Sequence, residues 1–320
     1  MPAVFVTSKI PEEGLTLLRQ KGYSVEVNDK VDLPGEKLKE AFSKYDAVIT
    51  LITDKVDTNL ISSSGASLKI ISNYAVGFDN IDVAAAKQKG IAVTNTPGVA
   101  SESVAEHTFA LILACVKQIV EADKFVRLGK YKKWDPYSFV SPQVWGKTIG
   151  IIGLGKIGTF VGQIAKNGFR MNILYFDISR SEDFELLSEA KFADVATIVK
   201  EADIVTLHVP LNEHTKHLIG ERELSSMKKT AILINTSRGP VIDETALINA
   251  LSEKRIAAAG LDVFEHEPDI PESLTALPNV VMTPHSASAT METRVQMSKI
   301  AAQNIIDVFE GKEPVGLVKI

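Results

Sequence analysis

The sequence contains few of the features that several classes of protein require. Cys115 is the only cysteine among 320 residues, so no disulfide can form within the chain, and we expect a reducing, cytoplasmic location. The 35 lysines and arginines are outnumbered by 40 aspartates and glutamates, which gives a formal net charge of -5. This balance predicts no nucleic-acid partner and no contact with an anionic membrane surface.

Long hydrophobic runs are also missing. Met1–Ile10 lacks the basic start and the extended apolar stretch of a signal peptide, so none is expected. The densest apolar run, Phe109–Val116, is far too short to span a bilayer. The remaining composition, 45% hydrophobic and 23% charged, is that of an ordinary globular chain, and the length predicts two domains that each bury a core.

In the first hundred residues, short apolar runs alternate with helical segments. Strands are expected at Ala3–Thr7, Tyr23–Val27, Asp46–Leu51, Lys69–Ser72 and Ile91–Thr94. Helices are expected at Pro11–Lys21, Gly35–Phe42, Asp57–Ile61 and Asp82–Lys89. The alternation predicts an α/β domain with a small doubly wound parallel sheet, and Thr96–Val99 then marks a hinge.

The most informative segment is Thr148–Gly158, which reads T-I-G-I-I-G-L-G-K-I-G. Its first part, Thr148–Ile152, has the continuous apolar character of a buried parallel strand. A G-x-G-x-x-G turn follows, and a helix is expected over Thr159–Asn167. A glycine turn between a strand and a helix is typical of a dinucleotide-binding unit.

Each glycine of this turn has a mechanical role in binding a pyrophosphate. Gly153 allows the tight bend, Gly155 lets the backbone approach the phosphates, and Gly158 lets the helix pack closely on the strand. Lys156 and Ile157 lie between the last two glycines, where the approach to the new helix offers free N–H groups and a positive dipole. The turn therefore predicts where the phosphates bind.

A second strand, expected over Met171–Phe176, ends at Asp177. An acidic residue at this place accepts hydrogen bonds from the hydroxyls of the adenosine ribose. Arg180 follows three residues later and could touch a 2′-phosphate, but Asp177 should repel that phosphate. The sequence therefore favours NAD(H) as the cofactor, with NADP(H) as the alternative.

A second α/β run continues from there to the end of the chain. Its further strands are expected at Asp203–Val209, Ala231–Asn235, Ala257–Asp262 and Val280–Thr283, and its helices include Glu221–Met227, Glu244–Leu251 and Ala289–Glu310. Before it, Ser103–Glu106 has a capping-box pattern and opens a run without Gly or Pro that lasts to Leu128, which predicts one helix of about 40 Å. Because Phe109–Val116 is apolar on all sides, we expect it to be buried between domains or in a subunit interface.

The residues just past the predicted strands suggest where chemistry takes place. In an open parallel sheet, ligands bind beyond the carboxyl ends of the strands. The residues found there are His208–Pro210, Thr236–Arg238, Asp262 and Pro284–His285, and Glu267 follows shortly after Asp262. Although they are scattered along the chain, we expect them to converge on one crevice.

Three of these residues suit hydride exchange at a 2-hydroxy or 2-oxo acid. Arg238 offers a rigid fork of donors to a carboxylate and a neighbouring oxygen. His285 can take the proton from the C2 hydroxyl, or return it in reduction. If Glu267 hydrogen-bonds the far ring nitrogen of His285, it fixes the tautomer and stabilises the imidazolium.

Over essentially its whole length the chain resembles the D-isomer-specific 2-hydroxyacid dehydrogenases, most of all their glyoxylate/hydroxypyruvate reductase branch. The segments that carry the resemblance are A-V-G-F-D-N-I-D (Ala75–Asp82), V-T-N-T-P-G-V (Val93–Val99), V-A-E-H-T (Val104–Thr108), W-G-K-T-I-G-I-I-G-L-G-K-I-G (Trp145–Gly158), H-V-P-L (His208–Leu211), L-I-N-T-S-R-G-P-V-I-D-E (Leu233–Glu244), A-G-L-D-V-F-E-H-E-P (Ala259–Pro268) and T-P-H (Thr283–His285). Taken together, they are highly specific.

The resemblance implies two doubly wound parallel-sheet domains and an oligomeric state. Residues 100–287 would form a Rossmann domain that binds the dinucleotide. Residues 1–99 and 288–320 would form a smaller flavodoxin-like domain that binds the substrate, to which the C-terminal helix returns. The implied activity is reduction of a small 2-oxo acid to its D-2-hydroxy acid, with NAD(H), in a homodimer.

The resemblance also implies roles for single residues. Arg238, Glu267 and His285 would be the catalytic set, and the N–H groups of Val76 and Gly77 would bind the substrate carboxylate. The residues implied along the cofactor are Thr108, Val209, Pro210, Thr236 and Asp262. One departure concerns the base: His285 is followed by Ser286-Ala287, where the family usually has an apolar residue and then glycine, so the backbone there is expected to differ.

Several alternatives remain open. Leu51 and Trp134 either close a small substrate pocket, Trp134 from a partner subunit, or simply pack. Glu265 competes with Glu267 as the acid, although the resemblance selects Glu267. The family resemblance also leaves open another substrate, such as D-lactate or D-3-phosphoglycerate, or a nicotinamide-sensing binding protein of the corepressor type.

The other histidines are predicted to be structural. His214 and His217 form an H-x-x-H pattern, but in a polar segment without a third ligand, so we expect a solvated loop and no metal site. His208 and His107 are expected to be packed and hydrogen-bonded. His266 is expected to be an exposed spacer.

Overall fold

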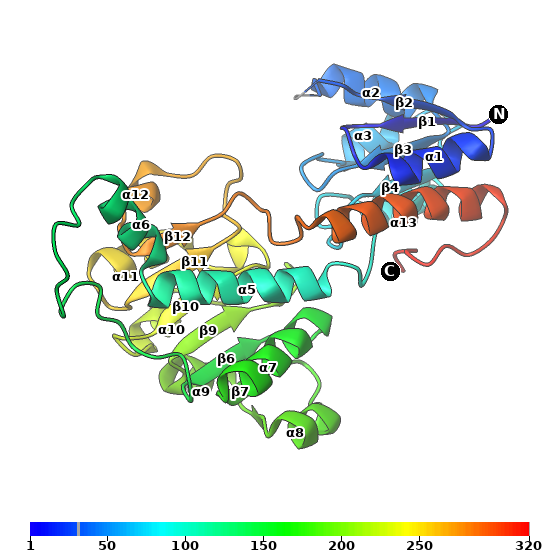
Figure 1. The fold of residues 1–320 in the computed structure, drawn as a ribbon. Coiled ribbons are helices and arrows are strands. Elements are labelled where there is room, and N and C mark those ends of the chain that lie inside the picture. Colours follow the sequence, from blue (N-terminus) through cyan, green and yellow to red (C-terminus); the bar gives the residue numbers. More distant parts are fainter. Residues whose placement is uncertain (31–32, 320) are drawn as a thin grey trace. The chain divides into compact units, whose positions relative to one another are not determined.

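The chain divides into two units, each built on one parallel sheet (Figure 1). The computed structural model describes residues 1–30 and 33–319. The first unit consists of Met1–Ala100 together with the chain from Ala289 onward, and the second is Ser101–Ser288. The structure confirms the predicted fold class of two doubly wound α/β sheets.

The sheet of the first unit has the strand order β2-β1-β3-β4-β5, which is the flavodoxin-like order. Its strands are β1 (Ala3–Val6), β2 (Ser24–Val27), β3 (Ala47–Thr50), β4 (Ile70–Asn73) and β5 (Ala92–Thr94). Its helices are α1 (Glu12–Gln20), α2 (Gly35–Lys44), α3 (Thr58–Ser62), α4 (Val83–Gln88) and α13 (Met291–Phe309). All the strand pairs are parallel, as the alternation of elements predicts.

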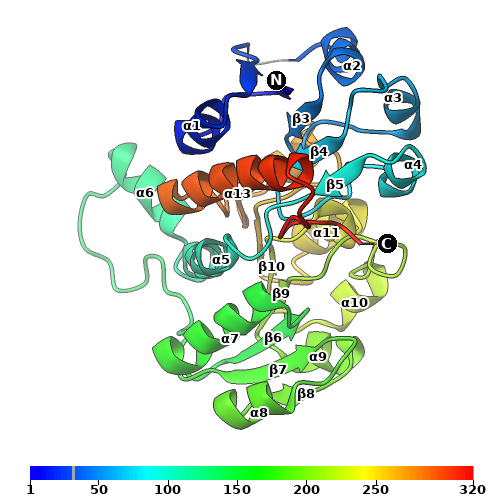
Figure 2. The same ribbon diagram turned by 90° about the vertical axis from the view of Figure 1, so that its right-hand side faces the viewer.

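Both faces of this sheet are covered by helices. Val4 and Val6 pack on one face in a cluster with side chains of α1 and α13, while Phe5 points to the other face, where α2, α3 and α4 lie. Figure 2 shows α13 lying beside α1 along the sheet. Successive side chains of a strand point to opposite faces, so a strand buried on both sides must be apolar at every position, as β1 is.

The sheet of the second unit has seven parallel strands. They are β6 (Thr148–Ile152), β7 (Asn172–Phe176), β8 (Lys191–Phe192), β9 (Ile204–Leu207), β10 (Ile232–Asn235), β11 (Ala258–Leu261) and β12 (Val280–Met282). Their order across the sheet is β12-β11-β10-β9-β6-β7-β8. The order reverses at β6, between β9 and β7, which makes the carboxyl end of β6 the switch point where ligands bind in such folds.

Helices cover both faces of this sheet as well. They are α5 (Ser101–Val116), α6 (Ile119–Arg127), α7 (Lys156–Phe169), α8 (Glu182–Ser188), α9 (Val195–Glu201), α10 (Glu221–Ser226), α11 (Glu244–Ser252) and α12 (Glu272–Thr275), with a short 3-10 turn at Gly239–Val241. Side chains of α5 and α7 share one core cluster with the sheet, and side chains of α9, α10 and α11 share the other. Among the described residues, no helix is both long and apolar enough to cross a membrane.

The prediction of one continuous helix up to Leu128 is wrong. Helix α5 ends at Val116, and α6 begins at Ile119 after Gln118, whose backbone is left-handed at φ 51°. The break follows from packing, because α5 lies on α7, β10 and β11, whereas α6 has no buried residue. Where the sheet no longer supports the helix, its direction changes.

Most of the apolar side chains of Phe109–Val116 are buried in the core of their own unit, and Phe109 stacks on Phe169 of α7 at a ring-centroid distance of 5.3 Å. Ala110 remains exposed, and the expected place of this run at a domain or subunit interface stays a prediction. Cys115 is buried in the same core, and burial raises the pKa of its thiol to about 12. The apolar run therefore reflects the packing of α5 on β10 and β11 and against its neighbour α7.

Candidate active site

Two glycines of the turn at the end of β6 are required because other backbone segments lie against them. Gly153 has a φ of +99°, and a Cβ there would lie 2.6 Å from the backbone of His208. A Cβ on Gly158 would lie 2.1 Å from the carbonyl oxygen of Gly153. Both positions therefore need glycine for the fold itself.

The middle glycine is different. A Cβ on Gly155 would meet nothing within 4 Å, and its backbone φ of -64° suits any residue. Packing thus gives no reason for glycine here, and the space above this residue is open. A pyrophosphate that approaches the backbone would fill this space, so the turn fits a dinucleotide.

Helix α7 begins earlier than predicted, at Lys156 rather than Thr159. Gly155 is the residue before the helix and offers no side chain to cap it. The first N–H groups of a helix have no partner within the helix, and the helix dipole makes this end positive. Lys156 and Ile157 therefore present their N–H groups next to the open space above Gly155.

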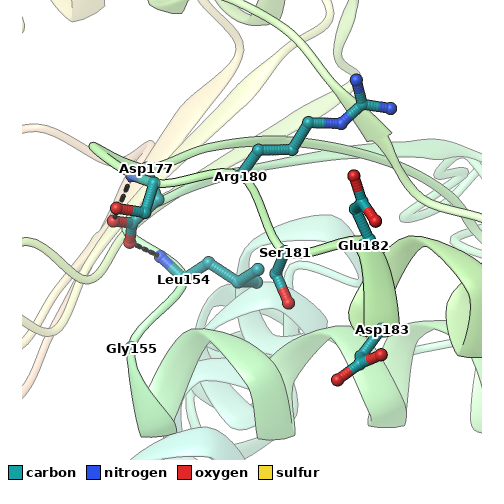
Figure 3. A pocket seen from close by; sticks show the side chains of 8 residues that line it. Leu154, Gly155, Asp177, Arg180, Ser181, Glu182 and Asp183 are labelled. Carbon is teal, nitrogen blue, oxygen red and sulfur yellow. Dashed lines mark hydrogen bonds between the residues drawn. The ribbon is translucent and has the colours of Figure 1, made fainter.

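A cavity of about 550 Å³ lies beside this turn (Figure 3). Its lining includes Leu154, Gly155, Asp177 and the segment from Ser179 to Asp183. The carboxylate of Asp177 accepts a hydrogen bond from the N–H of Leu154 at 2.6 Å, which fixes it at the mouth of the glycine turn. An adenosine ribose in this cavity would meet an oriented hydrogen-bond acceptor.

The other predicted cofactor residues lie at the carboxyl ends of neighbouring strands. Val209 and Pro210 follow β9, Thr236 follows β10, and Asp262 follows β11. The hydroxyls of Thr108 and Thr236 are 3.1 Å apart, so α5 reaches the same edge of the sheet. These residues thus share the edge at which the glycine turn lies.

His208 is part of the packing at this edge. Its Nε2 lies 2.9 Å from the hydroxyl of Thr206, and burial lowers the pKa of the imidazole to about 3. The ring is therefore neutral at physiological pH. This agrees with the predicted structural role.

The loop that carries His285 is folded around the carboxylate of Asp262, which is only 1% exposed. One carboxylate oxygen accepts hydrogen bonds from the Thr283 hydroxyl at 2.6 Å and the Ser286 N–H at 2.8 Å. The other accepts from the Ala287 N–H at 2.8 Å. The backbone N–H of His285 donates to the carbonyl of Asp262 at 2.8 Å, and His285 itself has a left-handed φ of 50°.

This geometry accounts for the unusual pair after the histidine. Ser286 and Ala287 each donate a backbone N–H to Asp262, which any residue other than proline provides, and the Ser286 hydroxyl lies 3.5 Å from the same carboxylate. His107, on α5, adds a further support because its Nε2 lies 2.9 Å from the hydroxyl of Thr283. His107 is thus a structural residue of this loop, as predicted.

The structure brings Glu267 and His285 together. Nδ1 of His285 lies 2.8 Å from one carboxylate oxygen of Glu267, and the other oxygen accepts a hydrogen bond from the N–H of Phe264 at 3.0 Å. About 31% of the His285 side chain and 29% of the Glu267 side chain are exposed. The imidazole is therefore held at Nδ1, and Nε2 is the ring nitrogen that a substrate could meet.

The pKa of Glu267 is lowered by its surroundings. Burial on its own would raise this pKa, but the hydrogen bond and the charge of His285, the N–H of Phe264 and the charge of Arg238 together outweigh that effect. Glu267 is therefore a carboxylate at neutral pH. An anion bonded to Nδ1 favours the imidazolium form of the ring.

Arg238 lies next to the Phe264–Glu267 segment because Gly239 has no side chain. A Cβ on Gly239 would lie 1.8 Å from the carbonyl oxygen of Phe264, so the two backbones touch. Asn235 donates to the carbonyl of Arg238 at 2.8 Å, and the guanidinium donates to the carbonyl of Ser237 at 2.8 Å. The guanidinium, the carboxylate of Glu267 and the imidazole thus share one edge of the sheet.

Glu265 has a separate task. Its carboxylate accepts hydrogen bonds from the N–H of Glu244 at 3.1 Å and lies 2.8 Å from Nε2 of His217. The N–H of Glu265 donates in turn to the carboxylate of Glu244 at 3.1 Å. Glu265 thus joins its own loop to the start of α11 and to the loop of His217, and Glu267 is the glutamate that contacts His285.

In the first unit, Leu51 follows β3, and Val76 and Gly77 lie after β4, at the carboxyl edge of that sheet. The side chains of Asn95 and Asn73 donate to the carbonyls of Val76 and Gly77, at 2.7 and 2.9 Å. Both peptide groups are thereby held in place. Trp134 lies in the other unit, in the segment between α6 and β6, and is 75% exposed.

Some residues of the site carried no recognised sequence signal. The role of Thr283 could have been inferred from its place in T-P-H, directly before the histidine. The contact of Glu185 with Arg180 beside the cavity, and that of Tyr175 with Glu185, could not have been inferred, because both depend on how α8 returns to β7. The catalytic and binding roles of the predicted residues stay predictions.

Comparison with known proteins gives a consistent result. Residues 109–287 match the family model described as D-isomer specific 2-hydroxyacid dehydrogenase, NAD binding domain. The chain is 48% identical to a glyoxylate reductase of Thermococcus litoralis over 322 residues, which cover 99% of this chain and 96% of the relative. It is also 48% identical to a glyoxylate reductase of Aeropyrum pernix, with the same coverage.

Solved structures are similar over the whole chain. The TT0316 protein of Thermus thermophilus has a TM-score of 0.93 and 37% identity, covering 99% of this chain and 100% of that one. An NADPH-dependent glyoxylate/hydroxypyruvate reductase of Sinorhizobium meliloti, in complex with NADP and malonate, has a TM-score of 0.85 and 30% identity. This match covers 99% of this chain and 96% of that one.

The contrast between the glycines yields a testable prediction. Gly158→Ala should lower the free energy of unfolding by about 1–3 kcal/mol, because its Cβ would press on the backbone of Gly153. Gly155→Ala should unfold like the wild type but bind NADH about tenfold or more weakly, because its Cβ would occupy the space of the pyrophosphate. Urea unfolding and fluorescence titration with NADH measure the two effects. Wild-type NADH affinity in Gly155→Ala would contradict the assignment of this space.

Proposed function

Because this chain belongs to the D-isomer specific 2-hydroxyacid dehydrogenase family, we propose that it reduces glyoxylate and hydroxypyruvate to the corresponding hydroxy acids with NADH. The chain is an oxidoreductase of this family, and its second unit carries the NAD-binding domain. The observation that carries the proposal is the Glu267–His285 pair at 2.8 Å, on the sheet edge that also carries Arg238 and the glycine turn. The names of the similar reductases support glyoxylate as a substrate.

We assign the adenosine ribose to Asp177 and the pyrophosphate to the open space above Gly155, next to the N–H groups of Lys156 and Ile157. The remaining cofactor residues are Thr108, Val209, Pro210, Thr236 and Asp262. When bound, NADH supplies the hydride that is transferred to the substrate carbonyl carbon. Asp177 is an anion in the ribose pocket and opposes a 2′-phosphate, which supports NAD(H) as the cofactor.

The residues of the chain supply the proton and the orientation. Arg238 binds the substrate carboxylate and the adjacent carbonyl oxygen, with the planar fork that a guanidinium provides. His285 would donate the proton on Nε2 to the carbonyl oxygen of the substrate, so that this oxygen becomes the C2 hydroxyl of the product and the imidazole becomes neutral. Glu267 holds Nδ1, so that Nε2 faces the substrate.

In the first unit, the N–H groups of Val76 and Gly77 would bind the substrate carboxylate. The peptide plane that carries the N–H of Gly77 is held through the carbonyl of Val76, which accepts from Asn95. The plane that carries the N–H of Val76 is held through the carbonyl of Ala75, which accepts from the N–H of Thr96 at 2.9 Å. Leu51, together with Trp134 of the partner subunit in the proposed dimer, would bound the space for the substituent on C2. A small pocket would favour glyoxylate and hydroxypyruvate over bulkier 2-oxo acids.

The proposal is tested by following NADH oxidation with glyoxylate, hydroxypyruvate, pyruvate and phenylpyruvate. Turnover of the first two is expected. His285→Ala should lower kcat by about 10²–10⁴, the usual contribution of a positioned acid, while NADH still binds. A chain that binds NADH but turns over none of these acids would instead fit a nicotinamide-sensing protein.

The Glu267–His285 pair predicts a pH dependence. Reduction consumes a proton, so His285 must be protonated beforehand and the rate falls as pH rises. In Glu267→Gln the anion that favours the imidazolium is gone, so this fall should begin at lower pH. The measurement is kcat/KM for glyoxylate from about pH 5 to about pH 9, the range in which histidines titrate.

Glu265→Gln is the matched control, because it removes the same charge two residues away and leaves the Glu267–His285 pair in place. Its pH profile should have the wild-type midpoint. Equal shifts in the two variants would show that the general loss of negative charge, rather than the hydrogen bond to Nδ1, sets the profile.

We further propose a cytoplasmic homodimer. The single buried cysteine supports a reducing compartment, and recovery of the activity outside the cytosolic fraction would refute a cytoplasmic location.

Large apolar side chains are exposed along α6 and the segment that follows it, and they include Ile119, Val126, Leu128, Trp134 and Tyr137. Such a concentration is typical of a surface that a second copy covers. Sedimentation equilibrium should give twice the mass of one chain, and a monomer would refute the dimer.

A further inference from the structure

Arg180 is placed to recognise the cofactor but does not point toward it. It lies three residues after Asp177 and lines the same cavity of about 550 Å³. Figure 3 shows its side chain directed away from Asp177. Among the described residues that line this cavity, Arg180 alone is positively charged, while Asp177, Glu182 and Asp183 are acidic.

The guanidinium is held by Glu185 of α8. Nε and Nη2 of Arg180 donate to the two carboxylate oxygens of Glu185 at 2.7 and 2.6 Å, which is the two-pronged geometry of a strong ion pair. The Glu185 side chain is 16% exposed, whereas the Arg180 side chain is 62% exposed. The carboxylate is thus the more buried partner and the guanidinium the more exposed one.

A buried tyrosine fixes Glu185 in turn. The hydroxyl of Tyr175 donates to Glu185 at 2.7 Å and accepts from the N–H of Ser181 at 2.9 Å. The Tyr175 ring is fully buried and packs edge-on against Phe184 and Phe192. Hydrogen bonds from Arg180 and Tyr175 lower the pKa of Glu185 to about 2, so the carboxylate is charged at neutral pH.

This arrangement has a consequence for a 2′-phosphate. Such a phosphate needs a cation beside the ribose, and arginine is the side chain best suited to it. We propose that Glu185 determines cofactor specificity by holding Arg180 in an ion pair, which withholds the Arg180 guanidinium from a 2′-phosphate. The proposal rests on the proposed use of NADH, and it adds to the repulsion by Asp177 a second element that disfavours NADPH.

The experiment is to release Arg180 and measure binding without turnover. Glu185→Ala should raise the affinity for NADPH relative to NADH by about tenfold, the worth of one charge-assisted hydrogen bond to phosphate in an exposed site. The same change should appear between adenosine 2′,5′-bisphosphate and AMP, which isolates the 2′-phosphate. Fluorescence and calorimetric titrations give these ratios. Glu185→Gln, which keeps the shape but not the charge, should change them in the same direction by a smaller factor.

Two further variants separate specificity from a structural role. Adding Arg180→Ala to Glu185→Ala should abolish the gain, because the released guanidinium is its source. Glu189→Ala is the matched control. Glu189 follows the same helix and pairs with Lys166, so the substitution removes an equal charge and one ion pair without affecting Arg180. Its NADPH-to-NADH affinity ratio should equal that of the wild type.

The outcomes are distinct. If the wild type binds NADH and Glu185→Ala leaves the ratio unchanged, or if Glu189→Ala raises it equally, the specificity role of Glu185 is wrong while the proposed function stands. If the wild type binds neither NADH nor AMP, the proposed function and this inference both fail. A gain that survives in the double variant would mean that the repulsion by Glu185, not the release of Arg180, disfavours the phosphate.

Discussion

The buried carboxylate of Asp262 organises the reactive edge of the second sheet. A carboxylate that is 1% exposed is stable only when donors surround it, and here the donors are the Thr283 hydroxyl and the N–H groups of Ser286 and Ala287. All three come from the chain just after β12. The hydrogen bonds to the Asp262 carboxylate therefore hold this segment around the end of β11. His285 lies in the middle of the segment, so Asp262 determines how its backbone is placed.

A close contact between two backbones at a glycine brings the other site residues of this edge together. Gly239 touches the carbonyl of Phe264, which brings Arg238 beside the segment that ends in Glu267. Within that segment, Glu265 bonds to Glu244 and His217, whereas Glu267 bonds to His285. Two glutamates in one short loop thus have different tasks, one joining loops and the other orienting the imidazole, because their side chains leave the backbone in different directions.

Much of the fold was predictable from the sequence, because buried parallel strands are continuous apolar runs and the glycine turn marks a switch point. The extent of α5 was not, since a helix of this composition can continue past Gln118, and only the end of the supporting sheet shows where it stops. The meeting of Glu267 and His285 was a prediction from the family resemblance and from the strand ends. The Tyr175–Glu185–Arg180 chain of contacts was not predictable, since it joins a strand, a loop and a helix through side-chain directions that spacing does not reveal.

The lowered pKa of Glu267 links stability to the proposed chemistry. A carboxyl group whose pKa is lower in the folded than in the unfolded state stabilises the fold above the unfolded pKa, and this contribution is lost as pH falls through the folded value. The proposed reduction needs Glu267 charged and His285 protonated at the same time. A lower pKa of Glu267 extends this state to lower pH. The surroundings that hold the carboxylate charged, Arg238 and the N–H of Phe264 included, therefore widen the pH range in which the pair can deliver a proton.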